Sequence, residues 1–254
     1  MGALVIVATP IGNLSDISPR ALDALRKADL IACEDTRQSL KLLNHFSISK
    51  SLVSYHDFNE EKKAAELGEK IRGGQTIALV SDAGTPGISD PGFRLVRYCR
   101  EQGLTVEAIP GPNAAITALS ASGLPSDEFF FAGFLPSKKS ARREKLESLR
   151  ALRATLVFYE APHRIEVTLT DFLEVLGDRE ACIARELTKL HEEFLFGKLS
   201  SIRDRVKPLG EFVVVVGGNT NADEPAIKGP LTREQVLKTL GLSRNELYDL
   251  FFKK

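Results

Sequence analysis

The sequence predicts an α/β protein with two α/β domains, a cleft between them and a small C-terminal helix-turn-helix. First, short apolar and β-branched runs alternate with helical patterns, as in β-α-β units. Second, glycine-rich segments follow several of these runs, at the position where open α/β sheets bind ligands. Third, a Gly-, Asn- and Pro-rich stretch begins near residue 219 and has the composition of a linker. We therefore expect domains at 1–123 and 124–218, a linker at 219–230 and the helix-turn-helix at 231–254.

The first domain is predicted to contain a mostly parallel sheet. Ser18 before Pro19 is a typical N-cap with Pro at the first helical position, and Pro112 opens a later helix in the same way. Gly73 and Gly74 end the helix that precedes them. The expected strands are 3–8, 29–33, 51–55, 76–81 and 105–110. The expected helices start at Pro19 and at Thr36, span 60–72, run through Leu95 and Val96, and span 113–122.

The second domain is predicted from a further set of alternating patterns after residue 123. It has longer strand pairs and fewer glycine-rich loops than the first domain, so the expected ligand loops lie mainly in the first. The expected strands are 129–134, 154–160, 181–186, a segment near 194–199, and 211–216. The expected helices are a basic one within 137–153, one over 163–176 and a short one from Ser200.

Two capping-box patterns predict the C-terminal helix-turn-helix. Thr232 with Gln235, and Ser243 with Glu246, each precede apolar residues at helical spacing, and Gly241 lies between them. Helical hairpins of this kind bind nucleic acid in some proteins and only pack in others. The sequence leaves both alternatives open.

The composition is that of an ordinary soluble globular protein. The 254 residues are 43% hydrophobic and 27% charged, with 34 basic and 34 acidic side chains, which excludes disordered, collagen-like and coiled-coil chains. The longest apolar runs are far below the roughly 18 residues of a membrane span. The first residues lack a basic signal-peptide region, so we expect a cytoplasmic protein. Cys33, Cys99 and Cys182 are widely spaced, and we expect them to be reduced core residues.

Basic residues cluster in two segments of this neutral chain. Residues 137–153 contain seven basic and two acidic side chains, and residues 228–254 contain six basic and three acidic ones. Local positive charge of this kind favours binding of a polyanion such as RNA. The alternative for each segment is a solvated helix face.

The loop at 79–92 is the most informative segment of the chain. It leaves a predicted buried strand, contains three glycines and two prolines, and leads into a helix. Glycine lets backbone groups approach a ligand closely, and Asp82 and Asp90 add hydrogen-bonding carboxylates. The alternative is a long turn that needs glycine for its geometry.

Two other loops follow predicted strands, at 9–14 and 110–116. The first contains a single glycine and lacks the dinucleotide fingerprint G-x-G-x-x-G, and no phosphate-binding P-loop occurs in the sequence. Nucleotide hydrolysis and NAD chemistry therefore lose their main support. The second enters a helix of small residues against which a flat ligand could lie.

Seven segments in order carry a resemblance to a known family: ATPIGNLSDIS, CEDTR, ALVSDAGTPGISDPG, IPGPNAAITALSASGLP, FYEAPHR, ARELTKLHEE and GEFVVVVGG. Over about residues 3–218 the chain resembles the ribosomal RNA small subunit methyltransferase I family, a branch of the tetrapyrrole methylase superfamily. The C-terminal helix-turn-helix resembles a small domain found in many members. The resemblance implies two α/β domains of the tetrapyrrole methylase type with a cofactor cleft between them, and a homodimer. It also implies S-adenosylmethionine as cofactor and 2′-O-methylation of a cytidine ribose in the decoding region of 16S rRNA.

The resemblance also implies which residues contact the cofactor. Those expected from the first domain are Pro10, Gly12, Asp82, Ala83, Ile88, Ser89, Ala114 and Ala115. Those expected from the second are Tyr159, Glu160, Arg185, Glu186 and Glu211.

Methyl transfer to a hydroxyl needs alignment and a proton acceptor but no metal. A carboxylate or a neutral histidine can accept the proton, and the candidates are Asp82, Glu160, Glu186, His56 and His163. The candidate RNA contacts are Arg37, Lys138, Lys139, Arg142 and Arg143. Tyr55, His56 and Phe58 form a possible stacking surface for an unpaired base, with packing inside the domain as the alternative.

Two other functions remain alternatives. One is a methylase of a tetrapyrrole or another small acceptor, and the other is a non-catalytic nucleic-acid-binding protein that uses its terminal helix-turn-helix. The basic segments favour RNA over a small acceptor, and the ligand loops disfavour binding alone. The expected partner is therefore small-subunit rRNA, either free or in the assembled 30S subunit.

Overall fold

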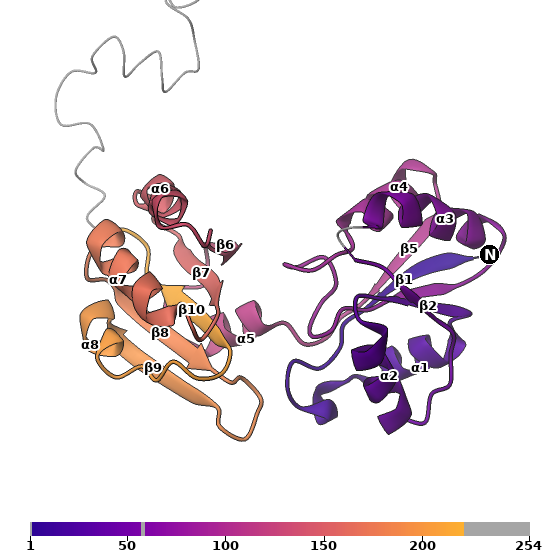
Figure 1. Cartoon of the computed structure of the whole chain (residues 1–254), viewed down its shortest axis with the longest axis horizontal. Coiled ribbons are helices and arrows are strands. Elements are labelled where there is room, and N and C mark those ends of the chain that lie inside the picture. The colour runs from indigo at the N-terminus through magenta and orange to yellow at the C-terminus, as the bar shows by residue number, and fades with distance from the viewer. Residues whose placement is uncertain (1, 57–58, 221–254) are drawn as a thin grey trace, which may run out of the picture.

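The part of the chain that the structure describes contains two five-stranded sheets, each flanked by helices (Figure 1). The computed structural model describes residues 2–56 and 59–220. In the first sheet the strand order is β3-β2-β4-β1-β5 and every pairing is parallel. The mostly parallel sheet predicted for the first half of the chain is confirmed. Its strands are β1 (Ala3–Val7), β2 (Leu30–Cys33), β3 (Leu52–Ser54), β4 (Ile77–Leu79) and β5 (Thr105–Ile109).

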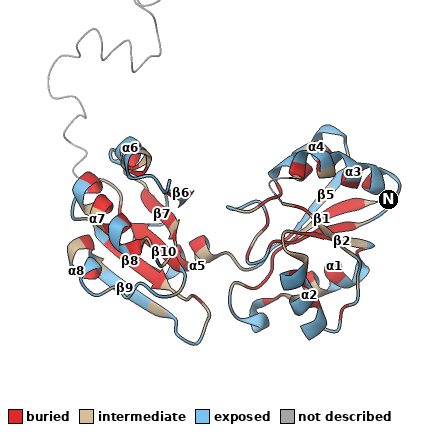
Figure 2. Ribbon diagram, in the orientation of Figure 1, coloured by how far each residue is buried: buried red, intermediate tan, exposed pale blue. Residues whose placement is uncertain are grey.

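Helices cover both faces of the first sheet (Figure 1). On one face α1 (Pro19–Lys27) and α2 (Thr36–His45) bury Leu25 and Leu43. On the other face α3 (Glu60–Arg72) and α4 (Phe93–Glu101) bury Leu67 and Leu95. The inner strands β1, β2 and β4 are largely buried, as expected for strands covered on both sides, which explains their unbroken apolar runs in the sequence. The edge strand β5 is mostly exposed (Figure 2).

Side-chain caps fix where the helices begin. Ser18 Oγ accepts a hydrogen bond from Ala21 N at 3.1 Å, so the predicted cap of α1 is confirmed. Asp35 Oδ1 accepts from Arg37 N at 2.8 Å and caps α2. The helix expected at 113–122 is α5 (Ala114–Ala121), and its N-cap is Asn113. Pro112 therefore lies one residue before the N-cap and not at the first helical position, so the way in which we expected it to open this helix is wrong.

The second sheet is mixed and has the order β6-β7-β10-β8-β9. β6 and β7 are parallel, whereas β10 is antiparallel to β7 and β8, and β9 is antiparallel to β8. Antiparallel neighbours can be joined by short connections, so this sheet needs fewer crossover helices than the first. The strands are β6 (Phe129–Phe134), β7 (Thr155–Glu160), β8 (Glu180–Arg185), β9 (Glu193–Lys198) and β10 (Phe212–Val216).

One face of the second sheet packs against α6 (Lys139–Leu149), α7 (Ile165–Leu176) and α8 (Leu199–Arg203). The opposite face packs against α5, which buries Ala115, Ala118 and Leu119 on β7, β8 and β10. Helix α5 thus lies on the second sheet, although the expected boundary at residue 123 assigned it to the first domain (Figure 1). The chain crosses between the two sheets immediately before α5.

All three cysteines are buried, as we predicted. Burial raises the pKa of the Cys99 thiol to about 11. Within the described residues, no helix has the length and apolar character that crossing a membrane requires. The expected linker and helix-turn-helix at 219–254 lie almost wholly outside the described residues, which end at Thr220.

Candidate active site

Three loops that the sequence marked separately meet at the carboxyl ends of the first sheet's strands. Thr9 after β1 and Gly84 after β4 form an isolated bridge, in which each backbone N lies 2.8 or 3.0 Å from the carbonyl O of the other residue. Thr85 Oγ1 donates to Pro112 O at 2.9 Å, which joins the loop after β5 to the same group. The loops are therefore fixed relative to one another at the edge where open α/β sheets bind ligands.

The second sheet approaches this edge through Gly133. The backbone of Gly133 has a φ of +62°, next to an irregularity in the β6–β7 register. A Cβ placed on Gly133 would lie 2.9 Å from Ser89 Oγ, a separation that real contacts do not tolerate. Glycine at this position therefore allows strand β6 and the 82–90 loop to come together.

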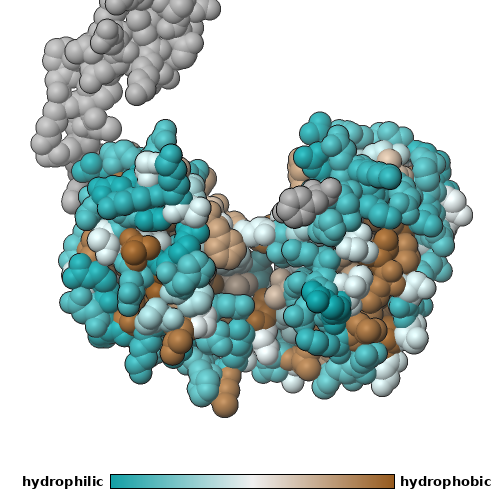
Figure 3. Space-filling view, viewed as in Figure 1, coloured by the Kyte–Doolittle hydropathy of each residue, from teal (hydrophilic) through white to brown (hydrophobic). Residues whose placement is uncertain are grey.

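A cavity of about 450 Å³ lies among these loops and the second sheet. Figure 3 shows the molecule hollowed between its two halves. The lining comes from both halves: Ile11, Asp82, Ala83, Gly84, Thr85, Ile88, Ser89, Asp90, Asn113, Ala114, Phe134, Tyr159, Glu160, Ala161, Pro162, Leu187, Glu211, Phe212 and Val213. We call this space the main cavity.

Most of the predicted cofactor contacts line the main cavity. They are Asp82, Ala83, Ile88, Ser89, Ala114, Tyr159, Glu160 and Glu211. The structure does not bring Pro10, Gly12, Ala115, Arg185 and Glu186 into this lining. Ala115 still contacts the site indirectly, because its N–H donates to Tyr159 Oη at 3.3 Å.

Asp82 is the exposed carboxylate among the predicted proton acceptors that line the main cavity. Its Oδ1 accepts a hydrogen bond from Asp35 N at 3.1 Å. This bond holds the side chain toward the start of α2 and links the ends of β2 and β4. Asp82 can therefore be both oriented and accessible to a substrate.

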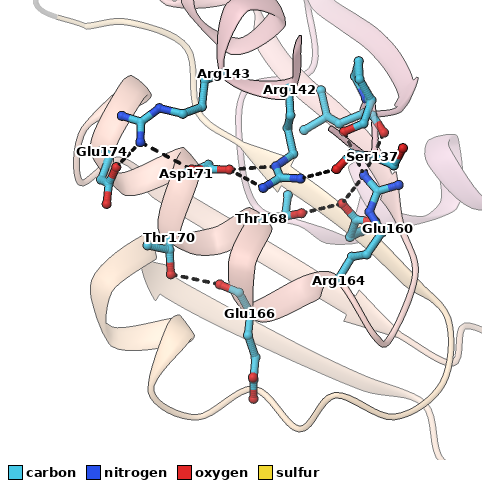
Figure 4. Close-up of polar contacts among 12 residues, drawn as sticks. Ser137, Arg142, Arg143, Glu160, Arg164, Glu166, Thr168, Thr170, Asp171 and Glu174 are labelled. Carbon is cyan, nitrogen blue, oxygen red and sulfur yellow. Dashed lines mark hydrogen bonds and ion pairs between the residues drawn. The ribbon is translucent and has the colours of Figure 1, made fainter. Parts of the chain in front are cut away.

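The carboxylate of Glu160, in contrast, is engaged inside the second half (Figure 4). It accepts from Thr168 Oγ1 at 2.6 Å and from Ala161 N at 2.8 Å, and it pairs with Arg164 at 3.2 Å. Glu160 is only 2% exposed. Its carboxylate is therefore not available as the proton acceptor that we predicted, and its contacts fix the end of β7 instead.

Glu186 is also held by neighbours. Its Oε1 accepts from Glu211 N and from Lys189 Nζ, each at 2.9 Å. The hydrogen bond from Glu211 N, followed by that from Lys189, lowers the pKa of Glu186. Glu186 therefore positions Glu211, which lines the main cavity. Arg185 pairs with Glu193 at 2.9 Å within the β8–β9 hairpin.

Tyr159 is a fixed aromatic wall of the main cavity. Its ring packs edge-on against Phe131 and Phe134, with centroid distances of 5.0 and 5.5 Å. Burial raises the pKa of the Tyr159 phenol. The phenol therefore stays protonated, and it accepts the hydrogen bond from the first turn of α5.

The predicted histidines and the described stacking candidates are not among the residues that line the main cavity. His56 follows β3, and its backbone N–H donates to Asn59 Oδ1 at 2.9 Å. His163 is exposed before α7. Tyr55 is 1% exposed, so the stacking role we predicted for it is wrong and the packing alternative holds. Phe58 lies outside the described residues.

The predicted RNA contact at Arg142 is also wrong. Arg142 is 5% exposed, and its guanidinium binds Asp171 at 2.6 Å and Ser137 O at 3.0 Å (Figure 4). The apolar residues Leu146 and Leu149 follow it at helical spacing, which turns Arg142 toward the core. Arg143 pairs with Glu174 on α7 and is partly exposed.

The other predicted RNA contacts are exposed. Lys138 and Lys139 lie at the start of α6. The side chain of Arg37 is 85% exposed and pairs with Asp35 at 2.6 Å. The Arg37 side chain, followed by its backbone N–H, lowers the pKa of Asp35 to about 2.

Sequence reasoning missed the apolar wall of the main cavity. Ile11, Phe134 and Leu187 come from three distant segments, and Phe134 is 56% exposed at the end of β6. The available sequence signal was the place of Phe134 directly after a glycine in the predicted strand 129–134, and it marks only one part of the wall.

Comparison with known proteins gives the class of this fold. The family model for Tetrapyrrole (Corrin/Porphyrin) Methylases matches residues 3–203. A protein of Halalkalibacterium halodurans named ribosomal RNA small subunit methyltransferase I is 52% identical over 227 residues, which cover 88% of this chain and 78% of the relative. A protein of the same name from Thermotoga maritima is 49% identical, with 86% of this chain and 99% of the relative covered. The chain belongs to the ribosomal RNA small subunit methyltransferase I family.

Solved structures agree with this fold. The uroporphyrin-III-C-methyltransferase of Thermus thermophilus has a TM-score of 0.60 at 21% identity, covering 96% of this chain and 100% of that one. Another structure of the Thermus enzyme, in complex with S-adenyl homocysteine, has a TM-score of 0.58 at 19% identity and covers 85% and 97% of the two chains. These likenesses show that the two-sheet arrangement is a methylase fold.

Proposed function

We propose that the protein transfers a methyl group from S-adenosylmethionine to the ribose 2′-oxygen of a cytidine in the decoding region of 16S rRNA. The rRNA substrate is supported by the name that relatives about 50% identical to this chain share. The cofactor is supported by the neighbour crystallised with S-adenyl homocysteine, the product that remains once the methyl group has left. We further propose a cytoplasmic homodimer that acts on the rRNA or on the assembled 30S subunit.

The observation that carries the proposal is the main cavity. Its volume of about 450 Å³ lies within the roughly 300–1,000 Å³ of small-molecule sites. Ile11, Ile88 and Leu187 offer apolar surface to an adenine ring, and the 82–90 loop offers backbone groups to the polar parts of the cofactor. The residues present therefore suit a ligand that is apolar in part and charged in part.

The chain's own residues would bind the cofactor, orient the reacting groups and accept the proton of the ribose 2′-hydroxyl. When bound, S-adenosylmethionine would supply an electrophilic methyl group to the ribose 2′-oxygen, with the neutral thioether as leaving group. Asp82 accepts the proton of the 2′-hydroxyl, and general bases of this kind contribute roughly 10²- to 10⁴-fold to a rate. The bridged loops and Tyr159 hold the reacting groups in line, which lowers the barrier further.

Mapping of 2′-O-methyl groups on 16S rRNA tests the proposal directly. Cells lacking this gene should lose one methyl group on a decoding-region cytidine and regain it with the wild-type gene. An unchanged methylation map would contradict the proposed function. Methylation of a tetrapyrrole by the purified protein, without activity on 30S subunits or rRNA, would instead support the small-acceptor alternative.

Calorimetry tests the cofactor separately. Purified protein should bind S-adenosylmethionine with the same affinity with and without a chelator, because methyl transfer from a sulfonium needs no metal. Loss of binding after chelation would contradict this part of the proposal.

A further inference from the structure

A second, smaller cavity adjoins Asp82. It has a volume of about 220 Å³ and is lined by Thr9, Pro10, Leu14, Gln38, Lys41, Leu42 and Asp82. These residues come from the segment after β1, from α2 and from the loop after β4. We call this space the acceptor cavity. Asp82 lines both cavities and is the residue that their linings share.

The size of the acceptor cavity limits its ligand. About 220 Å³ is below the roughly 300–1,000 Å³ of sites for whole cofactors and drug-sized molecules. A single planar group such as a nucleobase fits this range, whereas S-adenosylmethionine does not. The two cavities therefore differ in the ligand that each can accept.

The lining of the acceptor cavity suits a nucleobase. Pro10, Leu14 and Leu42 supply apolar surface for the flat face of a base. The Gln38 amide offers both a donor and an acceptor, which is what the polar edge of a base requires. Lys41 Nζ donates to Gln38 Oε1 at 3.2 Å, so the two polar side chains lie together on α2.

The approach to the acceptor cavity is suited to a nucleic acid chain. Arg37 precedes Gln38 on α2, and its side chain is 85% exposed. Asp35 holds the guanidinium through Nε and Nη2, at distances of 2.6 to 3.2 Å. An oriented, exposed guanidinium next to a base-sized cavity is suited to a backbone phosphate.

We propose that the acceptor cavity receives the base of the target nucleotide, with Gln38 and Lys41 contacting its polar edge and the ribose 2′-oxygen at Asp82. This inference rests on the proposed function, and it names the residues that select the acceptor. The donor in the main cavity and the ribose hydroxyl then meet at the carboxylate that lines both spaces. Amide and ammonium donors next to Asp82 favour cytosine, whose O2 and N3 accept hydrogen bonds, over uracil, whose N3 donates.

The test compares substrates as well as variants. The variants are Gln38→Ala, Lys41→Ala and Leu42→Trp, and the control is Lys62→Ala on the exposed side of α3. Methylation is measured on 30S subunits that carry either cytidine or uridine at the target position. Gln38→Ala and Lys41→Ala should lower kcat/KM for the cytidine substrate by roughly tenfold to a hundredfold and reduce the preference over uridine. The control should match the wild type.

Cofactor affinity and crosslinking separate the possible failures. The variants should bind S-adenosylmethionine as the wild type does, because none of the substituted residues lines the main cavity. RNA with 4-thiouridine at the target position should crosslink to the segment at 36–45, and Leu42→Trp should abolish that crosslink. If the wild type is active and the variants keep its kcat/KM, base preference and crosslinking, the acceptor cavity does not receive the target base. That result would leave the proposed function intact. Absence of methylation by the wild type would overturn the proposed function itself.

Discussion

At the scale of single residues, the structure separates carboxylates that hold the fold from one that is placed for chemistry. Glu160 and Glu186 are surrounded by donors from their own half of the molecule. Asp82 accepts one backbone hydrogen bond and lines both cavities. The three look equivalent in the sequence, because each stands at or directly after the end of a predicted strand. Only the three-dimensional positions of Thr168, Arg164 and Lys189 distinguish them.

Asp82→Asn isolates the proton-accepting role. The amide oxygen can still accept from Asp35 N, so the loop should keep its position, but an amide cannot take the hydroxyl proton. We expect kcat to fall by roughly 10²- to 10⁴-fold. The effect on cofactor affinity, to which Asp82 also contributes as a lining residue of the main cavity, should be much smaller. Steady-state kinetics and calorimetry measure the two quantities. Asp23→Asn on the exposed side of α1 is the matched control, and a kcat within twofold of wild type for Asp82→Asn would exclude Asp82 as the base.

The lowered pKa of Glu186 predicts a dependence of stability on pH. Its carboxylate is stabilised in the folded state by Glu211 N and Lys189, so the folded pKa lies below the unfolded one. The contribution to the free energy of unfolding is therefore present above the unfolded value of about 4.3 and is lost as the pH falls through the folded pKa. Urea unfolding between pH 3 and 7, roughly the range around that value, should show a flatter curve for Glu186→Gln than for wild type. Parallel curves would assign the acid sensitivity to other groups.

At the scale of elements, helix α6 shows how a basic segment divides into two roles. Lys138 and Lys139 are exposed at its start, whereas Arg142 faces inward and binds Asp171 on α7. A buried charge left without its partner is strongly destabilising, although a buried pair contributes little net stability. The segment therefore presents a basic surface and also ties α6 to α7 (Figure 4).

Substitutions in α6 should separate these roles. Arg142→Ala should lower the free energy of unfolding by about 3–5 kcal/mol, and the double variant Arg142→Met with Asp171→Leu should lose much less. Denaturant titrations measure both. An Arg142→Ala variant as stable as wild type would contradict the structural role of this ion pair.

The exposed lysines of α6 should act on RNA affinity instead. Lys138→Ala with Lys139→Ala should weaken RNA binding and reduce the salt slope by about two, because two phosphate contacts are removed. Stability and cofactor affinity should not change. Binding isotherms at several salt concentrations test this, with Lys62→Ala and Lys70→Ala on α3 as the matched control. A salt slope equal to that of the control would mean that these lysines form only a solvated helix face and do not contact RNA.

The buried contacts at the end of the 79–92 loop are a second arrangement at this scale. Glu60 Oε1 accepts from Gly92 N at 2.8 Å and from Tyr55 Oη at 3.2 Å, and Tyr55 Oη accepts from Leu95 N at 3.1 Å. Tyr55→Phe would leave the buried N–H of Leu95 without this acceptor, which costs about 1–3 kcal/mol of stability. Thermal and urea unfolding measure this loss. An unchanged stability would show that the loop end does not depend on Tyr55.

At the scale of the whole molecule, the sequence predicted the order of strands and helices better than their assembly. Local periodicity and caps such as Ser18 define each element, and the parallel first sheet follows from them. The small apolar residues of α5 fit either sheet, so its packing on the second sheet depends on the tertiary structure. Predicting the main cavity also required the tertiary structure, because its apolar wall joins Ile11, Phe134 and Leu187 from distant segments. The inward direction of Arg142, in contrast, was available from its spacing to Leu146 and Leu149.

The C-terminal segment provides the last prediction at this scale. The last described residues contact the second half of the molecule, since Asn219 N donates to Leu152 O at 2.7 Å. The described residues that line the two cavities all precede this point. We therefore expect a protein truncated after Thr220 to fold and to bind S-adenosylmethionine with the affinity of the full chain. The predicted helix-turn-helix carries basic residues, so its removal should raise the 30S concentration needed for half-maximal methylation while leaving the rate at saturation unchanged.

Calorimetry, kinetics on 30S subunits and analytical ultracentrifugation distinguish the explanations for the terminal segment. A monomeric or insoluble truncated protein would assign the predicted helix-turn-helix to subunit assembly instead of substrate binding, because its short helices are not stable in water without a packing partner. A truncated protein that is folded, binds cofactor and methylates 30S subunits with an unchanged half-maximal concentration would remove the substrate-binding role. Replacement of Arg233, Lys238 and Arg244 by Gln in the full chain keeps the segment present and removes charge alone. A rise in the half-maximal concentration in that variant would attribute the effect to electrostatic contact with the rRNA backbone.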